Sequence, residues 1–346
     1  MATIHDVAKL AGVSIASVSR MLAGENVRSA EAIRQAISDL GYRPNASARG
    51  LRLGKHHCIA VIVPDIANPY FAALVRGIEE RFMTQGFRII VASSDEQFSA
   101  ESELLGNLVD AVDAIAIVPA EEGERTRRLL AALNKPVVLI DRSVGDEPGF
   151  DLVNVDNTSG AKAAADYLLS LGHRRIGIIS GRQDTVPGRA RHQAFLATLA
   201  AAGVDVPVEA IKIGEFSRDF GRRAAQELIQ QGQIGAAPGA GAAGITALFV
   251  ANNTMAQGAL LALHAAGVSI PRELSFICFD DFDLAELLPA PVTVISRPAI
   301  AEGHAAADLL LRRIEHFGST NQPPLEHKVL PVSLTIRQSC AAPPFN

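Results

Sequence analysis

Apolar residues recur at two different spacings in two parts of the chain. Near the N-terminus they follow the three-to-four-residue period of short amphipathic helices, as at Ile4, Val7, Ala8 and Ala11. From Cys58 onward they gather into short continuous runs separated by helix-like stretches. Runs without polar alternation are typical of strands buried on both faces of a parallel sheet. The pattern therefore predicts a helical N-terminal domain followed by a larger α/β body.

The runs of the body fall into two groups of alternating strand and helix, which predicts two doubly wound parallel-sheet subdomains. The expected strands of these groups are 58–65, 87–95, 114–119, 136–141, 152–156, 175–181, 209–216, 247–252 and 274–281. Two later runs, at 292–298 and 328–338, are expected to cross back, so that the subdomains interleave. We expect an N-terminal subdomain of residues 56–156 and 291–322, a C-terminal subdomain of residues 157–290 and 323–340, a tail at 341–346, and crossings near Asp156, Pro291 and Pro323.

Local signals place three helices in residues 1–44. Thr3 has the side chain of a helix N-cap, and Gly12 supplies a turn after the first helix. Ser14 is placed to cap a second helix, and a third is expected over residues 29–40. Two short helices joined by a tight turn form the helix-turn-helix geometry that enters a DNA major groove.

Charge is distributed unevenly along the chain. The first 55 residues carry eight Lys and Arg against four Asp and Glu, whereas the net charge of the whole chain is −5. A basic head is attracted to phosphates and an acidic body is not. We therefore expect only the head to touch DNA; the alternative for the head alone is a small structural helical bundle with a solvated basic face.

Two long motifs identify a family. The segment 3–20 reads T-I-x-D-V-A-x-x-A-G-V-S-x-x-S-V-S-R, and the segment 41–51 reads G-Y-x-P-N-x-x-A-R-x-L. Together they resemble the amino-terminal signature of the lactose-repressor (LacI/GalR) family of bacterial transcription regulators. The resemblance implies that residues 45–55 form a hinge helix and linker. In a homodimer the paired hinge helices would insert Leu51 into the minor groove of a palindromic operator, with Ala48 keeping the pair close.

The same resemblance assigns DNA contacts to the head and hinge. The candidates are Thr3, Ser14, Ile15, Ala16, Ser17, Ser19, Arg20, Asn26, Tyr42, Asn45, Ala48, Arg49 and Leu51. Ile15 and Ala16 depart from the family pattern, because several relatives carry polar base-reading residues there. Apolar contacts to thymine methyl groups are the expected substitute. Arg20 is a candidate to hydrogen-bond to a guanine base, and a contact with a backbone phosphate is an equally good alternative.

The body resembles the periplasmic sugar-binding-protein fold that this family carries behind its DNA head. In open α/β sheets, ligands bind beyond the carboxyl ends of the strands, so residues that follow the strands are the first candidates. The expected effector-binding residues are Asp65, Tyr70, Phe71, Arg142, Arg189, Arg191, Phe216, Asn252 and Asp280.

Family matching and side-chain chemistry support this set. By resemblance, Arg191 in R-x-x-A-F, Asn252 in A-N-N and Asp280 in F-D-D match effector-contacting positions. Phe71 and Phe216 match ring-stacking positions. Carboxylate, amide, guanidinium and aromatic groups together fit a hydroxylated ring or a purine. Taken singly, each has a plainer alternative: a core phenylalanine, a surface ion pair or a helix N-cap.

One position of the body departs from the family pattern. Where relatives often have Asn followed by Asp, this chain has Asn252-Asn253. The role of the charged aspartate in those relatives therefore cannot be assigned to Asn253.

These features predict a ligand-responsive transcriptional regulator. We expect a repressor that binds operator DNA as a dimer and is controlled by a sugar or sugar acid in the cleft between the subdomains. A purine or nucleoside is the alternative effector. The alternative from another class is a sugar-binding receptor or transport component, which the basic head disfavours.

Enzyme, metal and membrane functions are not expected. The G-x-G-x-x-G match at 239–244 precedes a predicted strand instead of following one, so it cannot place a pyrophosphate on a helix N-terminus. The histidines lack helical metal-ligand spacing, and no cofactor is indicated. The three cysteines are far apart and odd in number, which favours reduced thiols. No uncharged apolar run reaches the roughly 18 residues of a membrane span, and a cytoplasmic location is expected.

Overall fold

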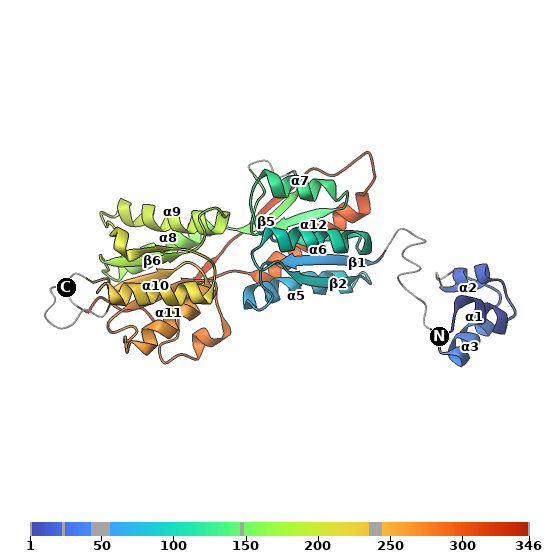
Figure 1. Ribbon diagram of the computed structural model, residues 1–346, viewed down its shortest axis with the longest axis horizontal. Coiled ribbons are helices and arrows are strands. Elements are labelled where there is room, and N and C mark those ends of the chain that lie inside the picture. The colour runs from blue at the N-terminus through green and yellow to red at the C-terminus, as the bar shows by residue number, and fades with distance from the viewer. Residues whose placement is uncertain (1, 23–24, 43–55, 146–148, 235–243, 345–346) are drawn as a thin grey trace. The chain divides into compact units, whose positions relative to one another are not determined.

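The computed structural model describes residues 2–22, 25–42, 56–145, 149–234 and 244–344, drawn in Figure 1. The chain divides into two units, Met1–His57 and Cys58–Asn346, which are described separately below. The hinge candidates Asn45, Ala48, Arg49 and Leu51 lie outside the described residues.

The first unit is the predicted three-helix head. Its helices are α1 (Ile4–Leu10), α2 (Ile15–Leu22) and α3 (Ala30–Leu40). The Thr3 hydroxyl accepts a hydrogen bond from the Asp6 backbone N–H, and the Asp6 carboxylate accepts one from the Thr3 N–H, so a capping box starts α1. Gly12 and Gly41 end helices with left-handed φ values of +64° and +56°. The core of the head is formed by Val7, Ala8, Val18, Ile33 and Ala36.

The second unit contains two six-stranded sheets with the same arrangement of strands. The first sheet has the order β11-β5-β4-β3-β1-β2 and the second β12-β10-β9-β8-β6-β7. The first comprises β1 (Cys58–Val63), β2 (Arg88–Ser93), β3 (Ala114–Ile117), β4 (Val137–Ile140), β5 (Asp151–Val155) and β11 (His327–Leu330). The second comprises β6 (Ile176–Ser180), β7 (Ile211–Ile213), β8 (Ala247–Val250), β9 (Ser275–Phe279), β10 (Thr293–Ser296) and β12 (Ser333–Thr335). All pairings are parallel except that of β12 with β10.

Helices cover both faces of each sheet and define two lobes (Figure 1). The first lobe has α5 (Pro69–Met83), α6 (Phe98–Leu108), α7 (Glu124–Ala132) and α12 (Ala299–His316). The second has α8 (Asn157–Ser170), α9 (Val186–Ala201), α10 (Arg218–Gln230) and α11 (Asn253–Ala265). Short 3-10 turns lie at η1 (Val109–Ala111), η2 (Val208–Ala210) and η3 (Asp283–Glu286).

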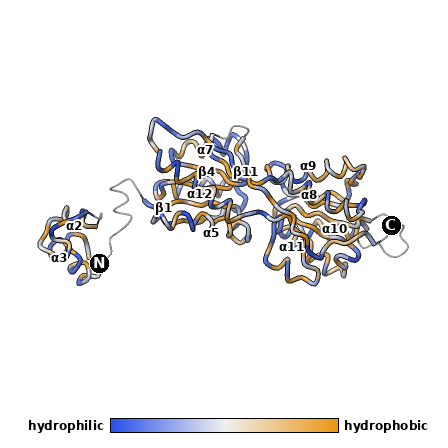
Figure 2. Tube along the Cα trace, turned by 180° about the vertical axis from the view of Figure 1, so that it is seen from behind, coloured by the Kyte–Doolittle hydropathy of each residue, from blue (hydrophilic) through white to orange (hydrophobic). Residues whose placement is uncertain are grey.

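The central strands β1, β3 and β4 of the first lobe are buried on both faces, as their sequence predicts, whereas the edge strands β2 and β11 are partly exposed. In β1, Ile59, Val61 and Val63 belong to the core cluster that includes α5 and α12. Ala60 and Ile62 belong to the cluster on the opposite face, under α6 and α7. Figure 2 shows the resulting concentration of hydrophobic residues along the strands inside each lobe. Two-sided burial explains the continuous apolar runs.

Two of the expected crossings between the lobes are misplaced. β10 pairs with β9, so residues 293–296 lie in the second sheet, not in the first. β11 pairs with β5, so residues 327–330 lie in the first sheet, not in the second. The apolar pattern identifies both runs as strands but does not encode their pairing partners. The chain therefore crosses after β5, after β10 and again between β11 and β12.

Close helix contact fixes α5 against α12 in the first lobe. A Cβ atom on Gly77 would lie 2.2 Å from the carbonyl oxygen of Ile300, and one on Gly303 would lie 2.2 Å from that of Leu74. The two glycines therefore let the helix backbones touch. Among the described residues, no helix is both long enough and apolar enough to cross a bilayer.

Gly303→Ala is expected to lower the free energy of unfolding of the body by about 1–3 kcal/mol, because the added methyl group overlaps backbone. Urea denaturation followed by circular dichroism measures this change. Gly106→Ala on α6 is the matched control, since its Cβ would meet no atom within 4 Å. The control should be as stable as the parent or up to about 1 kcal/mol more stable. Equal stabilities of the two variants would contradict the tight crossing.

Candidate functional site

A small cavity of about 50 Å³ lies between the two lobes, at the carboxyl ends of the strands. It is bordered by eight of the residues predicted from the sequence: Asp65, Tyr70, Phe71, Arg142, Arg191, Phe216, Asn252 and Asp280. The first four come from the first lobe and the other four from the second. The sheets thus bring together side chains that are far apart in the sequence.

Arg189, the ninth predicted residue, does not line this cavity. Its guanidinium lies 3.6 Å from the Glu122 carboxylate and donates to the Gln183 carbonyl oxygen at 3.0 Å. Successive helix residues are rotated by about 100°, so Arg189 and Arg191 on α9 point in opposite directions. Of the two, only Arg191 lines the cavity.

Several lining residues were not predicted from the sequence. Asp141 directly follows β4, and Arg297 directly follows β10, so the strand-end rule applied to these strands would have found both. Asn68, Glu96 and Thr254 also line the cavity. Glu96 lies in a turn after β2, and nothing in its local pattern distinguishes it from a solvated turn residue.

Arg191 is fully buried against Asp280. Its Nε donates to the Asn157 Oδ1 at 2.8 Å, and its Nη1 donates to the Ala251 carbonyl oxygen at 2.8 Å and to the Asp280 Oδ2 at 3.2 Å. Burial lowers the pKa of Arg191, and Asp280 opposes that change. The Nη2 of Arg191 and the Oδ1 of Asp280 have no hydrogen-bond partner within the described ranges. One donor and one acceptor of this buried pair are therefore left without a partner among the described residues.

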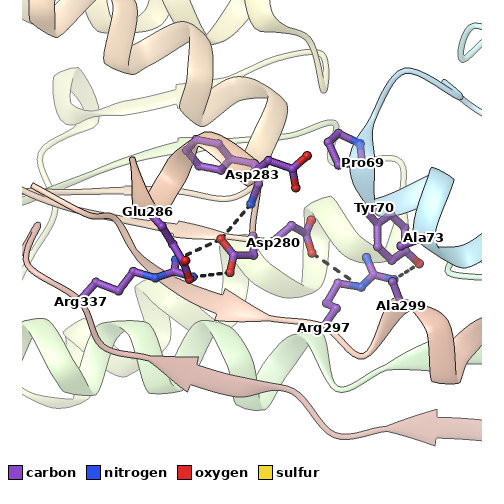
Figure 3. A pocket seen from close by; sticks show the side chains of 11 residues that line it. Pro69, Tyr70, Ala73, Asp280, Asp283, Glu286, Arg297, Ala299 and Arg337 are labelled. Atoms are coloured by element: carbon purple, nitrogen blue, oxygen red, sulfur yellow. Dashed lines mark hydrogen bonds and ion pairs between the residues drawn. The ribbon is translucent and has the colours of Figure 1, made fainter. Parts of the chain in front are cut away.

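Arg297 connects carboxylates of both lobes. It donates to the Asp141 Oδ1 at 2.7 Å and to the Glu302 Oε2 at 2.9 Å, and its Nε lies 3.7 Å from the Asp280 Oδ1. Figure 3 shows Arg297 between Asp280 and the Tyr70 hydroxyl, to which it also donates. Burial alone would lower the pKa of Arg297, but Asp141 and Glu302 raise it well above its ordinary value. Burial alone would raise the pKa of Asp141, but Arg297 and Arg191 outweigh it and lower that pKa.

The residues around Arg297 also border a second cavity of about 460 Å³, the one drawn in Figure 3. There Arg337 pairs with Asp281 at 2.6 Å and with Glu286 at 2.8 Å. Most charges along this cavity are thus matched within the protein. Tyr70, Asp280 and Arg297 form the wall that it shares with the small cavity.

Arg142 and Glu96 form a two-pronged ion pair at the other end of the small cavity. The two guanidinium nitrogens donate to the two carboxylate oxygens at 2.6 and 2.7 Å, and one also donates to the Pro119 carbonyl oxygen at 3.0 Å. Burial alone would lower the pKa of Arg142, but Glu96 raises it. Asp141 and Asp280 occupy equivalent positions after β4 and β9, and both have left-handed φ values, +65° and +67°. Such strained backbone is concentrated at binding sites.

Two aromatic residues face the cavity from different lobes. Phe71 lies on α5, with its ring centroid 4.8 Å from that of Tyr70. Phe216 follows β7, and its ring lies so close to Gly181 that a Cβ there would come within 2.0 Å of a ring carbon. Only glycine at position 181 allows this ring position. The cavity therefore has an aromatic surface on each side.

Polar contacts join the two lobes directly. The side-chain amides of Asn68 and Asn253 donate to each other's oxygens, at 3.2 and 3.0 Å. An aspartate at position 253 could accept but not donate, which gives a physical reason for the Asn252-Asn253 departure. In a second contact between the lobes, the Val186 N–H donates to the Glu122 carboxylate at 2.5 Å. These contacts hold the two lobes together.

The head exposes the beginning of α2. The Ser14 hydroxyl accepts from the Ser17 N–H at 3.2 Å, which starts the helix. Ile15, Ala16 and Arg20 are exposed, whereas Val18 on the same helix is completely buried. Among the other candidates, Thr3 and Asn26 are exposed, Ser17 and Ser19 are half-buried, and Tyr42 packs against the core of the head. This surface is the one that the helix-turn-helix geometry presents to a groove.

Comparisons with known proteins agree with this organisation. The family model described as bacterial regulatory proteins, lacI family, matches residues 3–45, and a periplasmic binding protein-like domain matches residues 165–340. The HTH-type transcriptional regulator CelR of Thermobifida fusca is 31% identical over 348 residues, covering 97% of this chain and 98% of CelR. The ribose operon repressor of Escherichia coli (strain K12) is 30% identical over 336 residues, covering 95% of this chain and 96% of that repressor. The solved structure of a CelR–cellobiose complex matches with a TM-score of 0.72 at 29% identity, over 98% of this chain and 100% of that one.

A helix-turn-helix head followed by two lobes that enclose a polar cavity defines a ligand-responsive DNA-binding regulator. The chain belongs to the lacI family of bacterial regulatory proteins. The predicted fold, with its DNA-binding head and periplasmic-binding-protein-like body, is confirmed. Members of this family regulate transcription and are not enzymes.

Glu101 is a buried carboxylic acid close to this site. Its Oε2 accepts from the Ala120 N–H at 2.7 Å, and its Oε1 has no hydrogen-bond partner among the residues described. Burial raises the pKa of Glu101 to about 7, and the hydrogen bond from Ala120 and the charge of Arg142 only partly oppose this. The folded state therefore favours the protonated acid. The stabilisation is complete below the ordinary pKa of 4.5 and is lost as the pH rises to about 7.

Glu101→Gln is expected to raise the free energy of unfolding at pH 8 by about 1–3 kcal/mol and to change it little at pH 5, because the amide carries no charge to bury. Thermal unfolding across this pH range measures the effect. Glu103→Gln, on the exposed face of the same helix, is the control and should be neutral throughout. A pH-independent effect of Glu101→Gln would show that its carboxyl group is not raised in pKa.

Proposed function

We propose that the chain is an operator-binding repressor, acting as a homodimer in the cytoplasm, whose effector is a neutral sugar bound in the small cavity between the lobes. The observation that carries the effector class is the pairing of charge around that cavity. Each lining arginine already faces a carboxylate: Arg142 faces Glu96, Arg191 faces Asp280, and Arg297 faces Asp141 and Glu302. An anionic effector would have to displace one of these pairs.

The available hydrogen-bonding atoms fit hydroxyl groups. The Nη2 of Arg191 and the Nε of Arg142 are buried donors, and the Oδ1 of Asp280 is a buried acceptor, all without hydrogen-bond partners in the described parts of the chain. A hydroxyl group both donates and accepts, so adjacent sugar hydroxyls would satisfy such a set. Phe71 and Phe216 would cover the apolar faces of the ring.

The paired arginines and the unpaired hydrogen-bonding atoms favour neutral sugars over the two other expected effectors. A sugar acid needs a cation for its carboxylate, and Arg189, one of the expected effector-binding residues, lies outside the cavity and faces Glu122. A neutral sugar presents more hydroxyl groups than a purine base does, so it would satisfy the unpaired donors and the unpaired acceptor more fully. Cellobiose is the ligand in the CelR complex, and ribose is bound in a solved lacI-family regulator from Enterococcus faecium that is 30% identical to this chain.

Control of transcription requires the effector to distinguish two states of the body. A sugar that bound both states with equal affinity would not shift the equilibrium between them. The two lobes meet through the Asn68–Asn253 amide pair and the Val186–Glu122 contact. A ligand bound between the lobes would therefore change the stability of the arrangement in which these contacts are made. We propose that this change alters how the paired heads engage the operator.

A thermal-shift screen of the full chain tests the effector class. Neutral pentoses and hexoses are compared with gluconate, glucose 6-phosphate, adenine and hypoxanthine. At least one neutral sugar should raise the melting temperature, because binding to the native state alone is stabilising. Asp280→Asn should weaken that binding about 10- to 100-fold, since the charged acceptor is lost while asparagine tolerates the left-handed backbone. Asp283→Asn, nearby but outside the small cavity, is the control. Stabilisation by the acids or purines alone would contradict the proposal.

Arg20→Ala is expected to reduce operator affinity at least tenfold while leaving sugar binding unchanged, because Arg20 is exposed on the groove-facing helix. The operator is first selected from random duplexes with the full chain, and binding is followed by fluorescence anisotropy. Arg128→Ala on α7 of the body serves as the control and should bind like the parent. Equal loss in both variants would place DNA contacts outside the head.

A further inference from the structure

Glu122 of the first lobe binds the start of a helix of the second lobe. It lies between β3 and α7, and only 10% of its side chain is exposed. Its Oε1 accepts a hydrogen bond from the Val186 N–H at 2.5 Å, and its Oε2 lies 3.6 Å from the guanidinium of Arg189. Both partners belong to α9, which begins at Val186. One carboxylate of the first lobe thus contacts the N-terminal turn of α9 twice.

The hydrogen bonds of this turn explain the contact. The first N–H groups of a helix have no acceptor within the helix. At the start of α9 the Thr185 hydroxyl accepts from the Gly188 N–H, and the Thr185 carbonyl oxygen accepts from the Arg189 N–H. Pro187 has no N–H. Among the described residues, the acceptor of the remaining donor, the Val186 N–H, is the carboxylate of the other lobe.

The hydrogen bond, and not the charge of Glu122, is the stabilising part of this contact. Burial raises the pKa of Glu122, and the hydrogen bond from Val186 opposes this only in part. The charges of Arg189 and Arg142 oppose it as well, whereas that of Asp141 adds to it. An amide oxygen would accept from the same N–H without a charge to bury. Position 122 therefore needs an acceptor more than it needs a charge.

The contact lies outside the small cavity but on a helix that reaches it. Glu122 and Val186 are not among the residues that line the cavity, whereas Arg191 of α9 is. The start of α9 is fixed within its own lobe, because a Cβ on Gly188 would lie 1.8 Å from the Arg182 carbonyl oxygen. The second lobe therefore cannot move away from the first without breaking the contact. The contact can be removed without changing any residue that lines the cavity.

We propose that Glu122 is a latch that holds the two lobes closed when no effector is bound. In the closed arrangement the Val186 N–H has a buried acceptor, which separation of the lobes would replace with water. The Asn68–Asn253 pair is a separate contact between the lobes. The latch needs no ligand, so it goes beyond the sugar function proposed above. Its strength would set how readily the lobes open to admit or release an effector.

Double electron–electron resonance between spin labels on the two lobes tests the latch in the full chain without ligand. The labels are attached at Arg128→Cys on α7 and Gln193→Cys on α9, both exposed positions. Cys340→Ser removes the partly exposed native thiol, and the other two cysteines are buried. Labelled chains are diluted with unlabelled ones so that only distances within one protomer contribute. The parent should show a single distance, that of closed lobes.

Glu122→Ala should add a second, longer distance in at least about a fifth of the molecules, because a buried donor without an acceptor shifts an equilibrium about 5- to 150-fold. Val186→Pro removes the donor from the other side of the contact, at the first helix position, which proline fits, and should open the lobes similarly. Glu122→Gln keeps the acceptor and should keep the single distance of the parent. Glu121→Ala, which removes the neighbouring carboxylate, is the matched control and should also behave like the parent.

An unchanged distance in Glu122→Ala or in Val186→Pro would overturn the latch, as would a parent whose lobes are already apart. Equal opening in Glu122→Ala and Glu121→Ala would show a general effect of charge and would overturn it too. Opening in Glu122→Gln as large as in Glu122→Ala would show that the charge holds the lobes, against the proposal. Circular dichroism checks that each variant is folded, and Val186→Pro decides if Glu122→Ala is not. Since no effector is added, the sugar function stands or fails separately.

Discussion

The compensation of buried charge between the two lobes is the constraint on which this site depends. The side chains of Arg191 and Arg297 are only 2% and 3% exposed, and an isolated buried charge is costly, so each must be matched by carboxylates. Asp280 belongs to the second lobe and Asp141 to the first, and Arg297, at the crossing after β10, lies close to both. The same ion pairs that make burial possible also join the two lobes. A ligand that hydrogen-bonds to these groups therefore acts directly on the contact between the lobes.

The architecture explains why the charged groups meet at one place. Both sheets have the same strand order, and their parallel strands end at the cavity. Asp141 and Asp280 are thus equivalent residues of two similar lobes, each following the strand at the same position of its sheet. Because the chain crosses between the lobes after β10, Arg297 is carried to the boundary, where it faces both aspartates. Duplicated topology and the crossings together produce a site that neither lobe forms alone.

Much of the fold and part of the site follow from local signals in the sequence. The capping side chains of Thr3 and Ser14 and the strand ends before Asn252 and Asp280 depend only on neighbouring residues, so they could be predicted. Strand pairing depends on partners far along the chain, which is why the positions of β10 and β11 were wrong. Arg189 and Arg191 are two residues apart on α9, so only one of them could face the cavity, and which one does depends on how α9 packs against its sheet.

The central claim is that sugar binding between the lobes is coupled to operator binding by the head. The most direct measurement is the affinity of the full chain for its selected operator with and without saturating sugar, together with its affinity for the sugar with and without operator. Coupling between two sites is reciprocal, so the account predicts that both affinities change by the same factor, of about 5- to 150-fold. Sugar binding that leaves operator affinity unchanged would contradict the account.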